Sequence, residues 1–466
     1  MSPTDTRRGS TLAVLCAVSL MVVLDSTIVA VAIPAIQVDL GFSPAGVAWV
    51  VNAYLVAFAG LLLLAGRLGD LLGAGRVFLT GLGVFTAASL LCGLAPTAGL
   101  LIAGRFVQGA GGALASAVVL GMIVRLYPEP GPQARAMGIY SFTQAGGAAI
   151  GFVVGGVLTD TAGWPAIFLI NAPIGVAAFL VGRRILPRDT GIGIGRDLDV
   201  AGALSITAGL SAGVFAIVEG RPAVGAVALL LIILFLVRQK YARTPLAPLR
   251  LLRRPRLLAA NAAVLLILAA GMGFQFVNTL FLQKIMGYDA LRTGAAFLPT
   301  PIVIGAVSLF LAARLTARFG PRPVLISGLA LLAAGLLLLS RMPADPSYLV
   351  DLLPGLLVMG LGIGVTVPAI MMLAMAGSSD EDTGLVSGVT NTAQQAGAAL
   401  GLAVLAAVAA GVSESRLAAG VAERAALHDG YSLAFLVGAG FVLGALVIVL
   451  TAPSPARVVT SGVVAG

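Results

Sequence analysis

Fourteen separate apolar runs constrain the fold of this 466-residue chain more than any other feature. A helix needs about 20 consecutive apolar residues to cross a membrane core of about 30 Å. The runs cover residues 12–36, 46–66, 77–95, 99–124, 135–159, 164–183, 199–218, 222–237, 258–283, 293–313, 323–341, 348–376, 383–411 and 431–452. Since only helices and closed barrels satisfy their backbone groups in lipid, the pattern predicts an all-α integral membrane protein with fourteen transmembrane spans.

The composition excludes a large soluble protein. Apolar residues make up 59% of the chain and charged residues 10%, whereas a soluble domain carries about 25% charged residues. The 60 glycines favour close packing of transmembrane helices, because small residues let helix backbones approach one another.

The basic residues predict how the chain is oriented. Their excess over acidic residues gives a net charge of +9, which in a soluble protein could indicate nucleic-acid binding. With a cytoplasmic N-terminus, however, 21 of the 28 basic residues lie in inner loops and tails and six in outer loops, as the positive-inside rule expects. We therefore expect a multi-pass protein of the cell membrane, a monomer, with both termini in the cytoplasm and no nucleic-acid partner.

Two internal repeats divide the spans into halves. Residues 134–154 align without gaps with 384–404, and residues 66–77 align with 313–324. Both offsets are close to 250 residues, about 50 more than six spans require, so two extra spans lie between two parallel six-span repeats. The predicted parts are an N-terminal six-span half (1–186), a linker region with two inserted spans and a basic cytoplasmic loop (187–256), and a C-terminal six-span half (257–466).

Asp25 and Arg105 are charged residues inside predicted spans, where charge is costly and commonly functional. At 1.5 Å per residue, Asp25 lies about 20 Å from the inner end of the first span and Arg105 about 9 Å from the outer end of the fourth. In a core of about 30 Å they lie at nearly the same depth. They are candidates for binding and releasing a proton. Alternatively, Asp25 caps a broken helix and Arg105 only links helices.

Glycines and charges form two further motifs. Gly66, Asp70, Gly73 and Arg76 join the second and third spans and predict a charged clasp that gates one side of the protein. A simple turn carrying positive-inside charges is the alternative. In the fifth span, four glycines form a small-residue face suited to close helix packing, namely Gly147, Gly151, Gly155 and Gly156.

Polar side chains within spans are candidates for lining a substrate cavity. Two groups of them recur at helical spacing on one face, in the ninth and thirteenth spans. They could equally join helices by hydrogen bonds. The candidates are Asn52, Tyr54, Gln144, Gln275, Asn278, Asn391, Gln394 and Gln395.

These motifs together resemble those of the 14-span drug:proton antiporters of the major facilitator superfamily, the EmrB/QacA type. The segments that carry the resemblance are 25–34, 66–76, 101–111, 147–156 and 163–175. The resemblance implies two six-helix halves, proton coupling by Asp25 and Arg105, and an antiporter role for the span-5 glycines. Three residues depart from the family pattern: Ala30 stands for Asn, Leu71 for Arg, and Phe152 for the Pro of span 5.

The leading hypothesis is proton-coupled export of a hydrophobic or amphiphilic small molecule, such as a drug, antibiotic or secondary metabolite. A lipid or metabolite transporter of the same architecture is the alternative. Polycationic substrates are not expected, because the last six spans lack a mid-membrane acid and Asp351 lies near an outer end.

An enzyme is not expected, although residues 379–382 could hold Mg²⁺. A nonconducting sensor would leave the carboxylate of Asp25 without a purpose. No cofactor or metal is expected, since His428, Cys16 and Cys92 are scattered. Neither lysine follows a glycine as a P-loop requires, so an ion gradient must supply the energy.

Overall fold

A computed structural model describes residues 3–186, 191, 199–242, 245–246, 254–375 and 383–452. Within these residues the protein is helical and contains no strand. Fourteen helical spans are long and apolar enough to cross a membrane, and they coincide with the fourteen predicted runs. The acidic segment 379–382 lies outside the described residues.

The first half contains spans 1 to 6. Span 6 is made of two helices in line, separated at Ile170. The elements are α1 (Pro3–Asp39), η1 (Gly46–Ala48), α2 (Trp49–Leu72), α3 (Ala74–Gly93), α4 (Ala98–Leu126), α5 (Pro130–Ala162), α6 (Pro165–Leu169) and α7 (Asn171–Ile185).

The second half repeats this arrangement with more irregular helices. Three π-helical turns interrupt or extend its spans, and span 10 is assembled from three consecutive pieces, α12, α13 and η3. The elements are α11 (Pro255–Leu280), η2 (Phe281–Ile285), α12 (Ala290–Phe297), α13 (Pro299–Val307), η3 (Ser308–Ala312), α14 (Ala313–Phe319), α15 (Pro321–Leu339), η4 (Tyr348–Leu352), α16 (Leu353–Met375), α17 (Thr383–Ala418) and α18 (Glu423–Thr451).

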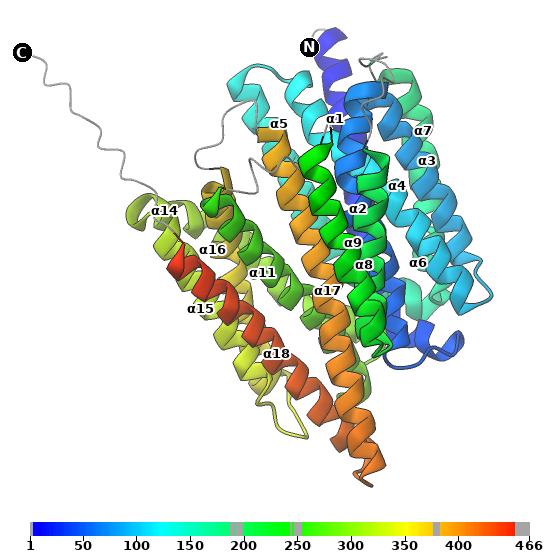
Figure 1. Ribbon diagram of the computed structural model, residues 1–466, viewed down its shortest axis with the longest axis vertical. Helices are drawn as coiled ribbons and strands as arrows, with labels where there is room; N and C mark the ends of the chain where they lie inside the picture. The colour runs from blue at the N-terminus through cyan, green and yellow to red at the C-terminus, as the bar shows by residue number, and fades with distance from the viewer. Residues whose placement is uncertain are drawn as a thin grey trace, which may run out of the picture.

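The inserted spans form a helical hairpin of α8 (Val200–Val218) and α9 (Pro222–Tyr241). The reversal between them is tight, and Gly220 adopts a φ of +63° there. Helix α8 contacts α2 of the first half and α17 of the second, so the hairpin lies against both halves (Figure 1).

Asp199 joins the start of α8 to the end of α9. Its carboxylate caps α8 by accepting from the Gly202 N–H at 2.9 Å, and it also binds Arg238 and Gln239 of α9. Burial by itself raises the pKa of Asp199, but these hydrogen bonds and the charge of Arg238 together lower it below 3.8. The ionised carboxylate therefore stabilises the hairpin.

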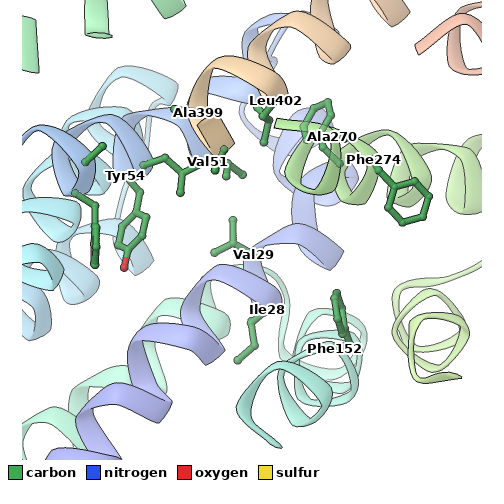
Figure 2. Packing of buried hydrophobic residues seen from close by; sticks show 14 of the residues in the cluster. Ile28, Val29, Val51, Tyr54, Phe152, Ala270, Phe274, Ala399 and Leu402 are labelled. Carbon is green, nitrogen blue, oxygen red and sulfur yellow. The ribbon is translucent and has the colours of Figure 1, made fainter. Parts of the chain in front are cut away.

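The two halves meet on the side of the bundle where α1 and α5 end. Gln283 donates to the Val31 carbonyl at 2.9 Å, and Lys284 donates to Gln37 at 2.9 Å. A single apolar cluster also extends across both halves, with side chains from α1, α2, α5, α11 and α17 (Figure 2). The halves are therefore joined by an apolar central contact and by polar contacts on that side.

Asp199→Ala is expected to lower the free energy of unfolding by about 1–2 kcal/mol at neutral pH, because the α8 cap is lost. A lowered pKa stabilises the folded protein at pH values above the ordinary pKa of an aspartate, so the difference from wild type should shrink as the pH falls through the lowered pKa of Asp199. Thermal unfolding in detergent measures it. Asp345→Ala is the control, since Asp345 forms an exposed ion pair with Arg424 and its loss should change little.

Candidate functional site

Asp25 on α1 and Arg105 on α4 form an ion pair inside the first half. Both side chains are 0% exposed, and Arg105 Nη1 lies 2.5 Å from Asp25 Oδ2. Glycines on α4 make this depth of burial possible: a Cβ on Gly109 would lie 2.3 Å from the Tyr54 carbonyl oxygen of α2. The close approach of α2 lets Arg105 Nε donate to the Val50 carbonyl at 2.8 Å.

The remaining surface of the guanidinium is covered by aromatic rings and an amide. Arg105 Cζ lies 4.5 Å from the centre of the Tyr54 ring and 5.7 Å from that of Phe168, within cation–π range. Arg105 Nη1 also donates to Gln108 Oε1 at 2.7 Å. A charge buried this deeply is tolerated only when it is paired and hydrogen-bonded. Here Nε and Nη1 of Arg105 are hydrogen-bonded, whereas Nη2 has no acceptor among the described residues.

Two amides complete the coordination of the carboxylate. Asp25 Oδ1 accepts from Gln108 Nε2 at 2.7 Å and from Asn171 Nδ2 at 3.0 Å. Both amide nitrogens also donate to Ser89 Oγ, at 3.0 and 2.9 Å, and this hydroxyl in turn donates to the Phe168 carbonyl. Four spans thus meet at one carboxylate, each contributing a polar side chain.

Three residues of this site are not among those expected from the sequence, namely Ser89, Gln108 and Asn171. Gln108 and Asn171 fall within the motif segments 101–111 and 163–175, and each is a polar residue in an apolar span. That polarity is the available signal. The position of a polar residue along its span gives its depth in the membrane. Whether its side chain faces Asp25 depends on the rotation of the helix, which packing determines.

The predicted clasp lies at the turn between α2 and α3. Gly73 has a φ of +97°, which explains why glycine is needed there. Asp70 lies 3.9 Å from Arg67 of its own helix, and no ion pair between Asp70 and Arg76 is found among the described residues. Gly66 has open space where a Cβ would project. The gating role of this turn stays a prediction.

The four span-5 glycines face two different partners. A Cβ on Gly147, Gly151 or Gly155 would collide with α1, and for Gly155 the obstacle is the backbone of Ile28 at 2.9 Å. A Cβ on Gly156 would instead lie 2.7 Å from the Ala290 carbonyl oxygen at the start of α12. The predicted small-residue face therefore splits into a seam within the first half and one contact with the second half.

Phe152, at the position of the family's proline, belongs to the contact with the second half. Its ring stacks on Phe297 of α12 with centroids 4.6 Å apart. On the same crossing, a Cβ on Gly294 would lie 2.1 Å from the Phe152 carbonyl oxygen, and Asp160 accepts from the Leu291 N–H at 2.8 Å. Helix α5 runs from Pro130 to Ala162 without interruption.

The candidate cavity residues are dispersed over four helices. Asn52 and Asn278 are fully buried, and both amide atoms of each lack a hydrogen-bond partner among the described residues, as does the Tyr54 hydroxyl. Gln144 Nε2 donates to the Tyr140 hydroxyl at 3.3 Å. Half-buried amides on α11 and α17 make up the rest, namely Gln275, Asn391, Gln394 and Gln395. Within the described chain no hydrogen bond joins two of these eight residues.

Comparison with known proteins agrees with this architecture. Residues 15–402 match the family model of the Major Facilitator Superfamily. The chain belongs to this superfamily. Among solved structures, a bacterial homolog of the human lysosomal transporter Spinster aligns with a TM-score of 0.67 and 16% identity, covering 98% of this chain and 100% of that one. At this identity the likeness shows the fold alone.

Curated relatives within the major facilitator superfamily include proteins of antibiotic export and resistance. The chain is 37% identical over 460 residues to the puromycin resistance protein of Streptomyces alboniger, covering 95% of this chain and 90% of the relative. It is 35% identical to the cephamycin export protein of Amycolatopsis lactamdurans, covering 96% and 93%. The probable actinorhodin transporter of Streptomyces coelicolor is 34% identical, covering 90% and 75%.

The α1–α5 seam of this facilitator gives a direct test of glycine packing. Gly155→Ala should destabilise the protein by about 1–3 kcal/mol, because the added methyl group meets the α1 backbone, which cannot rotate away. Thermal unfolding of the purified variant measures the effect. Gly146→Ala on the same helix is the matched control, since its Cβ meets nothing within 4 Å. Equal stability of the two variants would contradict the seam.

Proposed function

We propose that the protein is a proton-coupled exporter of a hydrophobic or amphiphilic small molecule, working by alternating access of its two halves. The buried ion pair of Asp25 and Arg105 carries this proposal, because a carboxylate held in a membrane core by a single opposite charge can change its charge by one proton. The export and resistance functions named for the relatives support the direction and the substrate class.

Asp25 and Arg105 couple protonation to structure. When Asp25 is ionised, the pair is neutral overall and its hydrogen bonds hold α1 against α4. A proton on Asp25 removes the attraction and leaves Arg105 as a buried unpaired charge, which is strongly unfavourable. The protonated protein is therefore driven toward a conformation in which Arg105 gains water or another partner. This difference in free energy between the two protonation states drives the conformational change.

The available energy is sufficient for efflux. One proton moving down about 150 mV releases about 3.5 kcal/mol. At about 1.4 kcal/mol per tenfold, this sustains a gradient of a few hundredfold for a neutral substrate. A single proton-binding carboxylate therefore suffices, and no nucleotide is required.

The contacts between halves support alternating access. With both termini in the cytoplasm of a cell membrane, as the distribution of basic residues favours, the α5–α12 crossing and the Lys284–Gln37 contact lie on the external side. Opening that side for release requires these contacts to break. The proposed moving parts are residues 1–186 and 257–466, joined by the region 187–256.

The substrate is proposed to bind between the halves, near the buried amides of Asn52 and Asn278. Unpartnered buried amides are unfavourable by about 1–3 kcal/mol, so a polar ligand group or water would satisfy them. The last six spans contain no mid-membrane acid, which favours neutral, zwitterionic or monocationic amphiphiles over polycations. Puromycin, the antibiotic named for one relative, is the first compound to test.

Asp25→Asn is expected to reduce proton-driven accumulation of puromycin in inverted vesicles to background while leaving equilibrium binding unchanged, because asparagine mimics the protonated acid but releases no proton. Asp351→Asn is the matched control: the Asp351 carboxylate caps the Ser347 N–H at a span end and should be dispensable for accumulation. Undiminished accumulation by Asp25→Asn would contradict coupling through this carboxylate, and loss in Asp351→Asn alone would transfer the role to that acid.

A further inference from the structure

The protonated state of Asp25 requires one of its present partners to change. Oδ2 faces Arg105, whose guanidinium has only N–H donors and cannot accept from a carboxylic O–H. A proton is therefore accommodated on Oδ1, which faces the amides of Gln108 and Asn171. One of these amides must turn its oxygen toward Asp25.

Gln108 cannot make that turn without breaking the ion-pair network. Its Oε1 accepts from Arg105 Nη1 at 2.7 Å while its Nε2 donates to Asp25 and Ser89, so all of its present contacts fix one orientation. Reversing it would place its NH₂ group against the guanidinium, donor against donor.

Asn171 is free of that constraint. Its Nδ2 donates to Asp25 Oδ1 and to Ser89 Oγ, and a half-turn of the amide brings its own oxygen to the new O–H of Asp25. Ser89 keeps its hydrogen bond from Gln108. Of the two bonds that Asn171 now donates, the one to Asp25 is replaced by a bond from the new O–H, and the one to Ser89 is lost.

That bond lies at the weakest turn of span 6. The helix is interrupted at Ile170, and Pro173 has no N–H to donate to the Leu169 carbonyl. The neighbouring Phe168 carbonyl accepts from Ser89 Oγ, so the Ser89 hydroxyl ties the α6 end to α3. A change at Asn171 is thus felt where span 6 can bend most easily.

We infer that Asn171 is a positioning residue whose amide reverses when Asp25 is protonated, and that this reversal loosens span 6 between α6 and α7. The inference rests on the proposed proton coupling. The titratable groups facing Asp25 from the described elements are Arg105 of α4, Tyr54 of α2 and Cys92 of α3. The neighbouring span 6 contributes the neutral Asn171.

Hydrogen exchange of residues 165–175 in the purified, substrate-free protein tests this inference. After correction for intrinsic chemistry, exchange in wild type should rise roughly fivefold as the pH falls and Asp25 is protonated, equivalent to about 1 kcal/mol for one hydrogen bond. Asp25→Asn should show no pH response. Asn171→Leu, of similar size but without a polar group, should also show none.

Asn171→Ser keeps a group that both donates and accepts a hydrogen bond, so it should retain part of the pH response. This variant distinguishes loss of the side-chain reversal from general damage to the helix. A wild-type response in Asn171→Leu, or a flat profile in wild type, would overturn the inference. A different result contradicts the proposed function, namely continued accumulation of puromycin in inverted vesicles that contain Asp25→Asn. If Asp25→Asn abolishes accumulation and Asn171→Leu keeps the exchange response, only the role of Asn171 is wrong.

Discussion

The buried guanidinium of Arg105 constrains how the surrounding helices of the first half are arranged. Arg105 has no exposed surface, and it is stable there because one carboxylate, two oxygen acceptors and two aromatic rings surround it. Those partners come from α1, α2, α4 and α6, so these elements are held in one arrangement by a single side chain. Any event that neutralises Asp25 changes the balance for all of them at once.

Much of this arrangement follows from the sequence. Hydropathy predicts all fourteen spans, including the closely spaced pair at 199–218 and 222–237, because membrane thickness fixes the length of a span. The rise of a helix predicts that Asp25 and Arg105 lie at one depth, and they are in contact. Membership of the major facilitator superfamily, which the resemblance implies, is confirmed by the matching family model.

What the sequence does not predict depends on rotation and tilt of helices. The depth of Ser89 and Asn171 can be estimated, but their convergence on Asp25 requires knowing which face of α3 and α7 turns inward. Likewise, the glycine pattern of span 5 predicts close packing without revealing that Gly155 meets α1 and Gly156 meets α12. One residue step turns a helix by about 100°, which is enough to change the partner.

The inserted hairpin bears on how the halves can move past one another. Helix α8 packs closely against α2, where a Cβ on Gly60 would lie 2.2 Å from the Thr207 hydroxyl. A Cβ on Gly213 of α8 would lie 3.8 Å from the Leu400 side chain of α17, which is ordinary van der Waals distance. Closely packed helices resist sliding, while looser side-chain contacts permit small shear displacements. We therefore expect the hairpin to move as a rigid body with the first half and to slide along α17 of the second half.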